Sequence, residues 1–230
     1  MTGGAVLIHG AWSCPADWRW VEELLVEHGV SVDALDLESH RRADATRADD
    51  VAQVAAAVAA AAGPTVVVGW SYGGSVITDL DLAGLDVARL VYVASVPGVP
   101  PGDEQGPPSA GDPDLSHISF GDDGTMVLDD RWFTTSDPAV ATMPAAVVEH
   151  LRSHPRRPVA LGAVIAPQER AAWRGTGTTV ILGRDDELVS EAQRRWAVDT
   201  IDDVRVVDCD HFIPFRRPDL VTDAIIAALA

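Results

Sequence analysis

Residues 65–74, TVVVGWSYGG, place four β-branched residues directly before a Gly-x-Ser-x-Gly sequence. The β-branched run over 65–68 predicts a short buried strand, because such side chains pack well on a pleated sheet. The segment from Gly74 to Leu82 predicts a helix. A strand, a tight turn and a helix form the setting in which this motif carries a reactive serine.

The predicted turn would expose the Ser71 hydroxyl above the edge of a sheet. Glycine suits the positions on either side of the turn, because Cβ atoms there would crowd it. The N-terminus of the next helix and the Tyr72 N–H could then face developing negative charge. A Gly-x-Ser-x-Gly sequence also occurs in ordinary turns, so the assignment depends on partners elsewhere in the chain.

The composition predicts one sizeable α/β domain. The chain has 230 residues, of which 47% are hydrophobic. No apolar run reaches the roughly 18–20 residues of a membrane span, and no basic N-terminal region precedes an apolar segment. We therefore expect a cytoplasmic protein without a signal peptide or membrane partner. Cys14 and Cys209 lack metal-ligand spacing and are expected as reduced thiols, with one disulfide as the alternative.

The charge balance narrows the classes of partner. Acidic residues outnumber basic ones by 35 to 17, and the formal net charge is -18, which argues against nucleic acid or an anionic membrane surface. All basic residues other than histidine are arginine, so Schiff-base, pyridoxal phosphate and P-loop lysines are excluded. No histidine pair at i, i+4 has a glutamate between its members, so a zincin-type site is not expected. We expect a small-molecule substrate, no cofactor and no metal, and the oligomeric state is left open.

Strands alternate with helices along most of the chain, which predicts a doubly wound, mostly parallel sheet of about six strands. Besides 65–68, strands are expected at 5–9, 30–35, 89–94, 178–182 and 204–207. Helices are expected at 15–28, 48–62, 159–165, 168–173, 190–199 and 218–229, with a polar loop over 36–47.

Residues 96–158 interrupt this alternation. The segment is rich in Pro, Gly and Asp at first and too long for an ordinary connection. Its scattered apolar residues are Ile118, Phe120, Met126, Trp132, Phe133 and Met143. We expect a cap that packs over the C-terminal edge of the sheet, inserted into a single domain spanning 1–230. The alternative is a poorly ordered surface excursion.

Two further residues follow predicted strands in positions that suit a serine nucleophile. Asp186 follows strand 178–182, and His211 follows strand 204–207. Because the C-terminal ends of parallel strands meet at one edge, Ser71, Asp186 and His211 should converge. His211 would take the serine proton, and Asp186 would orient the imidazole. Asp185 is the alternative acid.

Backbone N–H groups of Ala11 and Tyr72 are the candidate oxyanion donors, since a flexible His-Gly turn follows the first strand. Trp12, Trp132 and Phe212 are candidate residues of a substrate pocket, whereas Trp70 is expected in the core. Of the remaining histidines, His9 is expected to support the oxyanion turn. The others are expected at the surface: His28, His40, His117, His150 and His154.

Taken together, these motifs resemble the α/β-hydrolase fold family, and within it the small esterases related to plant methyl-salicylate esterases and hydroxynitrile lyases. The matching segments, in the family's order, are 9–12, 68–74, 90–94, 185–186, 210–211 and 217–219. The resemblance covers nearly the whole chain outside the cap. It implies Ser71, Asp186 and His211 as a catalytic triad, with Ala11 and Tyr72 as backbone oxyanion donors.

The sequence departs from this family in ways that bear on the substrate. Trp70, Ser95 and Ser190 stand where relatives usually have histidine, aspartate and proline. Gly10 and Phe212 stand where the lyases have a threonine and a lysine, so lyase chemistry is not expected. A serine nucleophile also argues against epoxide hydrolases and haloalkane dehalogenases.

Three functions are compatible with this set of residues. The first is hydrolysis of a small carboxylic ester with an apolar part through an acyl-enzyme. The second is hydrolysis of a carbon–carbon bond, lactone or thioester by the same triad. The third is non-catalytic ligand binding on the same fold.

Overall fold

A parallel six-stranded sheet forms the centre of the molecule in the computed structural model, which describes residues 3–109, 116–128 and 138–230. The strand order is β2-β1-β3-β4-β8-β9, and each neighbouring pair is parallel. The bounds are β1 Gly4–Ile8, β2 Ser31–Leu35, β3 Thr65–Trp70, β4 Val87–Val93, β8 Thr178–Gly183 and β9 Asp203–Val207. The predicted doubly wound sheet of about six strands is therefore confirmed.

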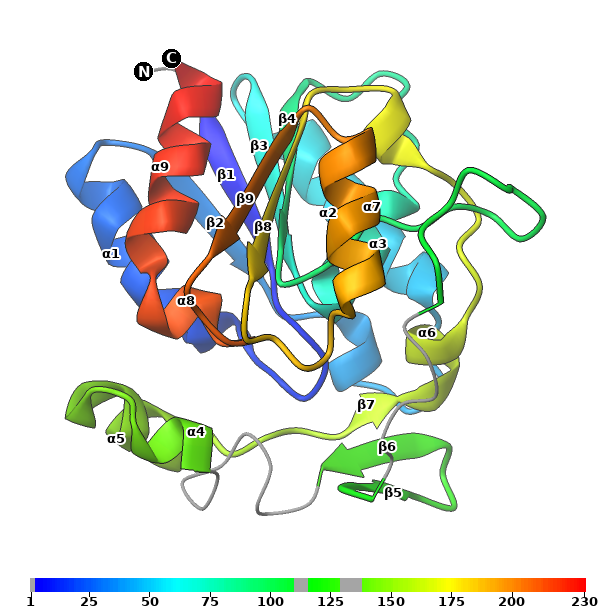
Figure 1. Cartoon of the computed structure of the whole chain (residues 1–230), viewed down its shortest axis with the longest axis vertical. Helices are drawn as coiled ribbons and strands as arrows, with labels where there is room; N and C mark the ends of the chain where they lie inside the picture. Colours follow the sequence, from blue (N-terminus) through cyan, green and yellow to red (C-terminus); the bar gives the residue numbers. More distant parts are fainter. Residues whose placement is uncertain (1–2, 110–115, 129–137) are drawn as a thin grey trace.

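Helices cover both faces of this sheet (Figure 1). One face carries α1 Arg19–Glu27, α8 Ile213–Arg216 and α9 Pro218–Leu229, and the other carries α2 Arg47–Ala60, α3 Tyr72–Thr78 and α7 Glu191–Thr200. Side chains of β1 alternate between the two faces, so that Ala5 and Leu7 join one core cluster while Val6 and Ile8 join the other. Burial on both sides explains why β1 is apolar along its whole length, whereas the edge strands β2 and β9 include charged residues such as Asp33 and Arg205.

Several helices differ from their predicted bounds. The helix predicted over 15–28 is a 3-10 turn at Pro15–Trp18 followed by α1. In place of the helix predicted over 168–173, the structure has a 3-10 turn at Ala172–Arg174. The helix after the serine begins at Tyr72 rather than Gly74, so Gly73 and Gly74 both lie inside it. A Cβ at Gly73 would lie 2.3 Å from the Ile8 carbonyl oxygen, so this glycine permits close packing on β1. The predicted loop 36–47 also contains a 3-10 turn, Glu38–His40.

Within the described residues, 116–128 and 138–165 lie beyond the C-terminal ends of the strands (Figure 1). They form a small antiparallel sheet and short helices: β5 Ile118–Phe120, β6 Thr125–Leu128, α4 Pro138–Ala141, α5 Ala145–Ser153, β7 Val159–Ala160 and α6 Leu161–Ile165. The predicted helix over 159–165 therefore begins with two strand residues, which pair with β6. Trp132 and Phe133 lie outside the described residues.

This segment is fastened to the turn that follows β1. The indole Nε1–H of Trp12 donates to the Met126 carbonyl at 3.2 Å, and the Arg157 N–H donates to the Trp12 carbonyl at 3.0 Å. Trp12, Met126, Leu128 and Val159 also form a separate apolar cluster. These contacts place the cap segment directly over the loop that was predicted to hold the oxyanion.

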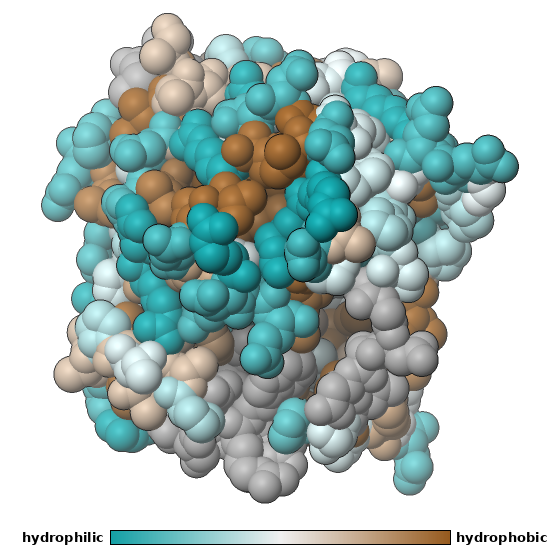
Figure 2. All heavy atoms as spheres, viewed as in Figure 1, coloured by the Kyte–Doolittle hydropathy of each residue, from teal (hydrophilic) through white to brown (hydrophobic). Residues whose placement is uncertain are grey.

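The outer surface is largely hydrophilic on the face shown in Figure 2, with hydrophobic residues gathered in its upper half. Within the described residues, no helix combines the length and apolarity that a membrane crossing requires.

Candidate active site

Ser71 occupies the tight turn between β3 and α3. Its backbone has φ 53° and ψ -117°, a region that non-glycine residues rarely adopt and that costs about 1–3 kcal/mol. The Ser71 N–H donates to the Val93 carbonyl at 3.0 Å, which ties the turn to the neighbouring strand. A Cβ at Gly69 would lie 2.4 Å from the Gly73 carbonyl oxygen, so glycine is required on the strand side of the turn.

Asp186 and His211 follow adjacent strands and meet beyond them. Asp186 Oδ2 lies 2.9 Å from His211 Nδ1, and the side chains expose 0% and 9% of their surfaces. The other carboxylate oxygen of Asp186 accepts the Leu188 N–H at 2.9 Å, which fixes its orientation. Asp185 is exposed to solvent. An Nδ1–H donated to the carboxylate leaves Nε2 of a neutral imidazole as a proton acceptor.

A pocket at this edge of the sheet brings the serine and the histidine together. It is lined by Gly10, Ala11, Trp12, Ser13, Trp70, Ser71, Arg156, Leu188 and His211. Ser71 Oγ makes no hydrogen bond to His211 in the described part of the chain, although both side chains face this one pocket. Such bonds are often long in ligand-free enzymes and shorten when substrate binds.

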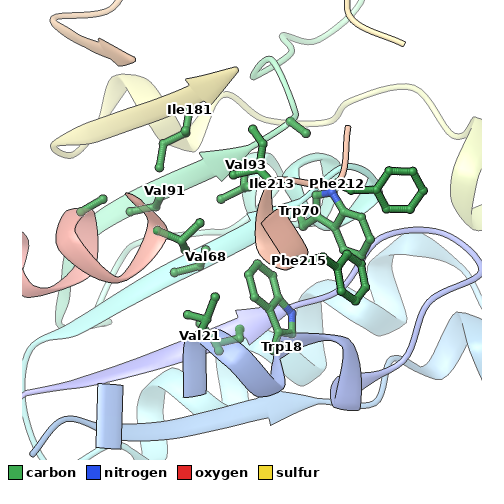
Figure 3. Close-up of a cluster of buried hydrophobic side chains, with 14 of the residues drawn as sticks. Trp18, Val21, Val68, Trp70, Val91, Val93, Ile181, Phe212, Ile213 and Phe215 are labelled. Carbon is green, nitrogen blue, oxygen red and sulfur yellow. The ribbon is translucent and has the colours of Figure 1, made fainter. Parts of the chain in front are cut away.

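The three candidate pocket residues, Trp12, Phe212 and Trp132, differ in where they lie. Trp12 forms part of the pocket wall. Phe212 is 4% exposed and belongs to a core cluster with Ile213 and Phe215 (Figure 3). Trp132 lies outside the described residues.

Trp70 packs in the core as expected, and it also fixes the histidine loop. Its indole Nε1–H donates to the His211 carbonyl at 3.0 Å, and its ring packs edge-on against Trp18 and Phe215 (Figure 3). The residue before the nucleophile thus holds the backbone of His211. This bond could not be predicted from local sequence patterns, because the two residues lie 141 positions apart.

The turn after β1 runs close to the nucleophile. A Cβ at Gly10 would lie 3.2 Å from Ser71 Cβ, so glycine suits this approach. Trp12 adopts a positive φ of 58°, and the Ser13 N–H donates to the Gly10 carbonyl at 3.3 Å, which closes the turn. Ala11, a candidate oxyanion donor, lies within this turn and in the pocket wall.

His9 supports the same turn from below. The His9 side chain is buried, with Nδ1 2.9 Å from the Gly10 carbonyl oxygen, while Nε2 accepts the Leu37 N–H at 3.4 Å. Both bonds are satisfied by the neutral Nδ1–H tautomer. Burial lowers the pKa of His9 to about 4, so the ring stays neutral at physiological pH.

Tyr72, the second candidate oxyanion donor, is anchored by a buried carboxylate. Its hydroxyl donates to Asp50 Oδ2 at 2.7 Å, and Asp50 Oδ1 accepts the Ser39 N–H at 2.9 Å. Burial raises the pKa of the Asp50 carboxyl. Sequence reasoning missed Asp50, although it shares a helical face with the apolar residues Val54 and Val58 at four-residue spacing.

A second buried polar group joins the cap segment to the wall of the pocket. Asp17 Oδ1 lies 2.9 Å from His150 Nε2, and the Asp17 carboxylate accepts two bonds from Arg156, at 2.8 and 3.1 Å. Burial alone would raise the pKa of Asp17, but the Arg156 guanidinium and the His150 bond hold it well below its usual range. The predicted surface position of His150 is wrong, since the residue is 6% exposed. Its acidic partner is 133 positions away, which hid the pair from sequence analysis.

Within residues 3–109, 116–128 and 138–230, no group of three or more His, Cys, Asp or Glu side chains is arranged to hold a metal ion. Cys14 and Cys209 are free thiols, and burial raises the pKa of Cys209 to about 11.

A hydrolase of the α/β type is the class of protein that this fold and site define. The chain belongs to the alpha/beta hydrolase family, because the sequence model of that family matches residues 5–224. None of the curated proteins matches the chain in sequence.

Solved structures with this fold include enzymes with several activities. A pyrethroid hydrolase from Sphingobium faniae JZ-2 is similar with a TM-score of 0.77 and 24% identity, over 100% of this chain and 98% of that one. Polyneuridine aldehyde esterase has a TM-score of 0.76 and 16% identity, over 100% of both chains. Tomato methylketone synthase I, complexed with 2-tridecanone, has a TM-score of 0.74 and 16% identity, over 100% and 98%. At these identities the likeness shows the shared fold alone, whereas the family model confirms the predicted membership of the α/β-hydrolase family.

Proposed function

We propose that the protein is a serine hydrolase that cleaves a small carboxylic ester with the triad Ser71, His211 and Asp186. The observation that carries this proposal is the 2.9 Å contact between His211 Nδ1 and buried Asp186, with the imidazole facing the pocket that also contains Ser71. A buried aspartate bonded to Nδ1 holds the imidazole in the tautomer that leaves Nε2 to accept a proton. It also stabilises the imidazolium that forms when the histidine acts as a general base. The strained backbone of Ser71 adds a second feature of such sites.

The reaction follows from these positions. His211 Nε2 takes the Ser71 proton while Oγ attacks the ester carbonyl, and the new oxyanion is held by the Ala11 and Tyr72 N–H groups. Collapse of this intermediate breaks the bond to the alcohol, which leaves with the proton from His211. Water then attacks the acyl-enzyme with His211 again as base, and the carboxylic acid is released with Ser71 restored.

The walls of the pocket favour a substrate with an apolar part. Ala11, Trp12, Trp70 and Leu188 present apolar surface beside Ser71. Enzymes named as hydrolases and esterases among the similar structures agree with ester cleavage. The net charge of -18 supports a small-molecule substrate over nucleic acid. We also retain the separate expectation of a cytoplasmic protein.

The proposal is tested by hydrolysis of p-nitrophenyl esters of graded acyl length. Wild type is compared with Ser71→Ala and with the control Ser119→Ala, which changes an exposed serine of β5. We expect turnover by wild type and the control, and its loss in Ser71→Ala. Equal rates in all three proteins would contradict the proposal. Absence of turnover together with an unreactive Ser71 would favour ligand binding without catalysis.

A further inference from the structure

Arg156 is the one charged residue of the pocket wall apart from the ionisable His211, within the described part of the chain. It lies in the cap segment, after α5, and its side chain exposes 7% of its surface. A cation so far withdrawn from water needs a partner for its charge and for each of its donors.

The terminal nitrogens of this guanidinium are fully engaged. Nη1 donates to Asp17 Oδ2 at 2.8 Å and to Ser13 Oγ at 3.2 Å. Nη2 donates to Asp17 Oδ1 at 3.1 Å and to the His154 carbonyl at 3.1 Å. The paired bonds to Asp17 balance the charge and fix the plane of the guanidinium.

The Nε–H of Arg156 is different. This nitrogen is buried and makes no hydrogen bond within residues 3–109, 116–128 and 138–230. Buried donors are almost always paired in folded proteins, so an unpaired one calls for an explanation. Here the unpaired donor belongs to a side chain that is 93% buried in the wall of the pocket containing Ser71.

We propose that Arg156 is a substrate-binding residue whose Nε–H donates to a second oxygen of the substrate, outside the scissile ester. The inference rests on the proposed ester hydrolysis and adds a substrate class to it: neutral esters with an ether, keto or hydroxyl oxygen near the reacting carbonyl. Asp17 already neutralises the guanidinium, which favours a neutral acceptor over a carboxylate.

The position of Arg156 also suggests where this oxygen lies. Its partner Ser13 belongs to the turn that contains Ala11, so the guanidinium stands on the oxyanion side of the pocket. A bond formed there would be largely shielded from water. Sites with a buried donor discriminate strongly against substrates that lack the matching acceptor.

Arg156→Lys is the sharpest substitution, because it puts a methylene at the place of Nε while keeping a cation beside Asp17. The matched control is Arg157→Lys. Arg157 also binds the 10–13 turn, through the Ser13 carbonyl at 3.0 and 3.1 Å, but it is not part of the described pocket wall. Circular dichroism and thermal melting check that each variant folds.

Two pairs of substrates report on the second oxygen. They are p-nitrophenyl methoxyacetate with butyrate, and p-nitrophenyl 3-methoxypropanoate with pentanoate; in each pair one ether oxygen replaces a methylene. For each protein the ratio of kcat/KM within a pair is divided by the ratio of hydroxide-catalysed rates, which removes intrinsic reactivity. A general effect on the oxyanion turn lowers kcat/KM equally for both esters of a pair, so it leaves the corrected preference unchanged.

We expect wild type to show a corrected preference for the oxygenated ester in at least one pair. Arg156→Lys should reduce it by about tenfold, the size expected for a bond from a charged donor. Arg157→Lys should keep the preference even if its turnover falls.

Ser71-dependent turnover with no corrected preference in wild type would overturn the inference, and that measurement does not depend on any variant folding. An unchanged preference in folded Arg156→Lys would do the same. Absence of Ser71-dependent turnover on all four esters would instead refute the proposed function, and this inference with it.

Discussion

Alanine substitutions at three glycines test the geometry of the nucleophile turn. In Gly73→Ala the new Cβ would lie 2.3 Å from the Ile8 carbonyl oxygen and 3.0 Å from the His9 carbonyl oxygen, both rigid backbone atoms. The turn must therefore move away from β1. Gly10→Ala brings Cβ to 3.2 Å from Ser71 Cβ, which a smaller shift relieves. Gly162 has no heavy atom within 4 Å of its would-be Cβ and provides the control.

The expected losses follow this order. A displacement of about 1 Å in a catalytic group costs about 10²-fold in rate, so Gly73→Ala should lower kcat/KM by at least about 10²-fold. Overpacking should also destabilise it by about 1–3 kcal/mol. Gly10→Ala should fall between Gly73→Ala and wild type, and Gly162→Ala should match wild type. Hydrolysis of p-nitrophenyl butyrate and thermal melting measure both effects. Wild-type activity and melting temperature in Gly73→Ala would refute this description of the turn.

Two substitutions and one pH dependence test the groups around the triad. Asp186→Asn should lower kcat by about 10⁴-fold, because an amide favours the wrong imidazole tautomer, and steady-state kinetics measure this. Tyr72→Phe leaves an oxygen of buried Asp50 without its donor and should cost about 1–3 kcal/mol in the free energy of unfolding, as measured by urea denaturation. His9 has a folded pKa of about 4 against 6.5 for the free side chain. The unfolded chain binds the extra proton, so stability from His9 is present above pH 6.5 and is lost as pH falls towards 4, by about 3 kcal/mol in total.

Each of these predictions has its own check. Asp185→Asn is the control for the acid and should retain activity; equal losses in both variants would contradict the assignment of Asp186. For Tyr72, the double variant with Asp50→Ala should lose less than the sum of the single changes, and strict additivity would mean that the bond contributes nothing. For His9, the acid-induced loss should shrink in His9→Gln, whereas an identical pH profile would show that other groups cause it.

The sequence predicted the sheet and the positions after its strands, because both depend on local patterns. β-Branched runs marked the buried strands, and the rule that parallel strands end at one edge brought Asp186 and His211 together. The other buried charged groups were not predicted. Asp17, His150 and Arg156 carry no local sign of burial, since the ion pairs among them join residues more than 100 positions apart.

The start of the helix after Ser71 was predicted two residues too late. Gly73 was assigned to the Gly-x-Ser-x-Gly turn and the helix was expected from Gly74, although Gly73 packs against β1 within the first turn of α3. The two-residue strand β7 could not be predicted either. Its pairing with β6 depends on a contact between segments about 35 residues apart, and two residues carry too little periodicity to indicate a strand.

Labelling with a fluorophosphonate, followed by mass spectrometry, tests most directly whether Ser71 is the activated nucleophile. We predict a single covalent adduct on the peptide that contains Ser71, with labelling lost in Ser71→Ala and strongly slowed in His211→Ala. Labelling of another residue, or labelling of Ser71 at the same rate without His211, would contradict the proposed triad.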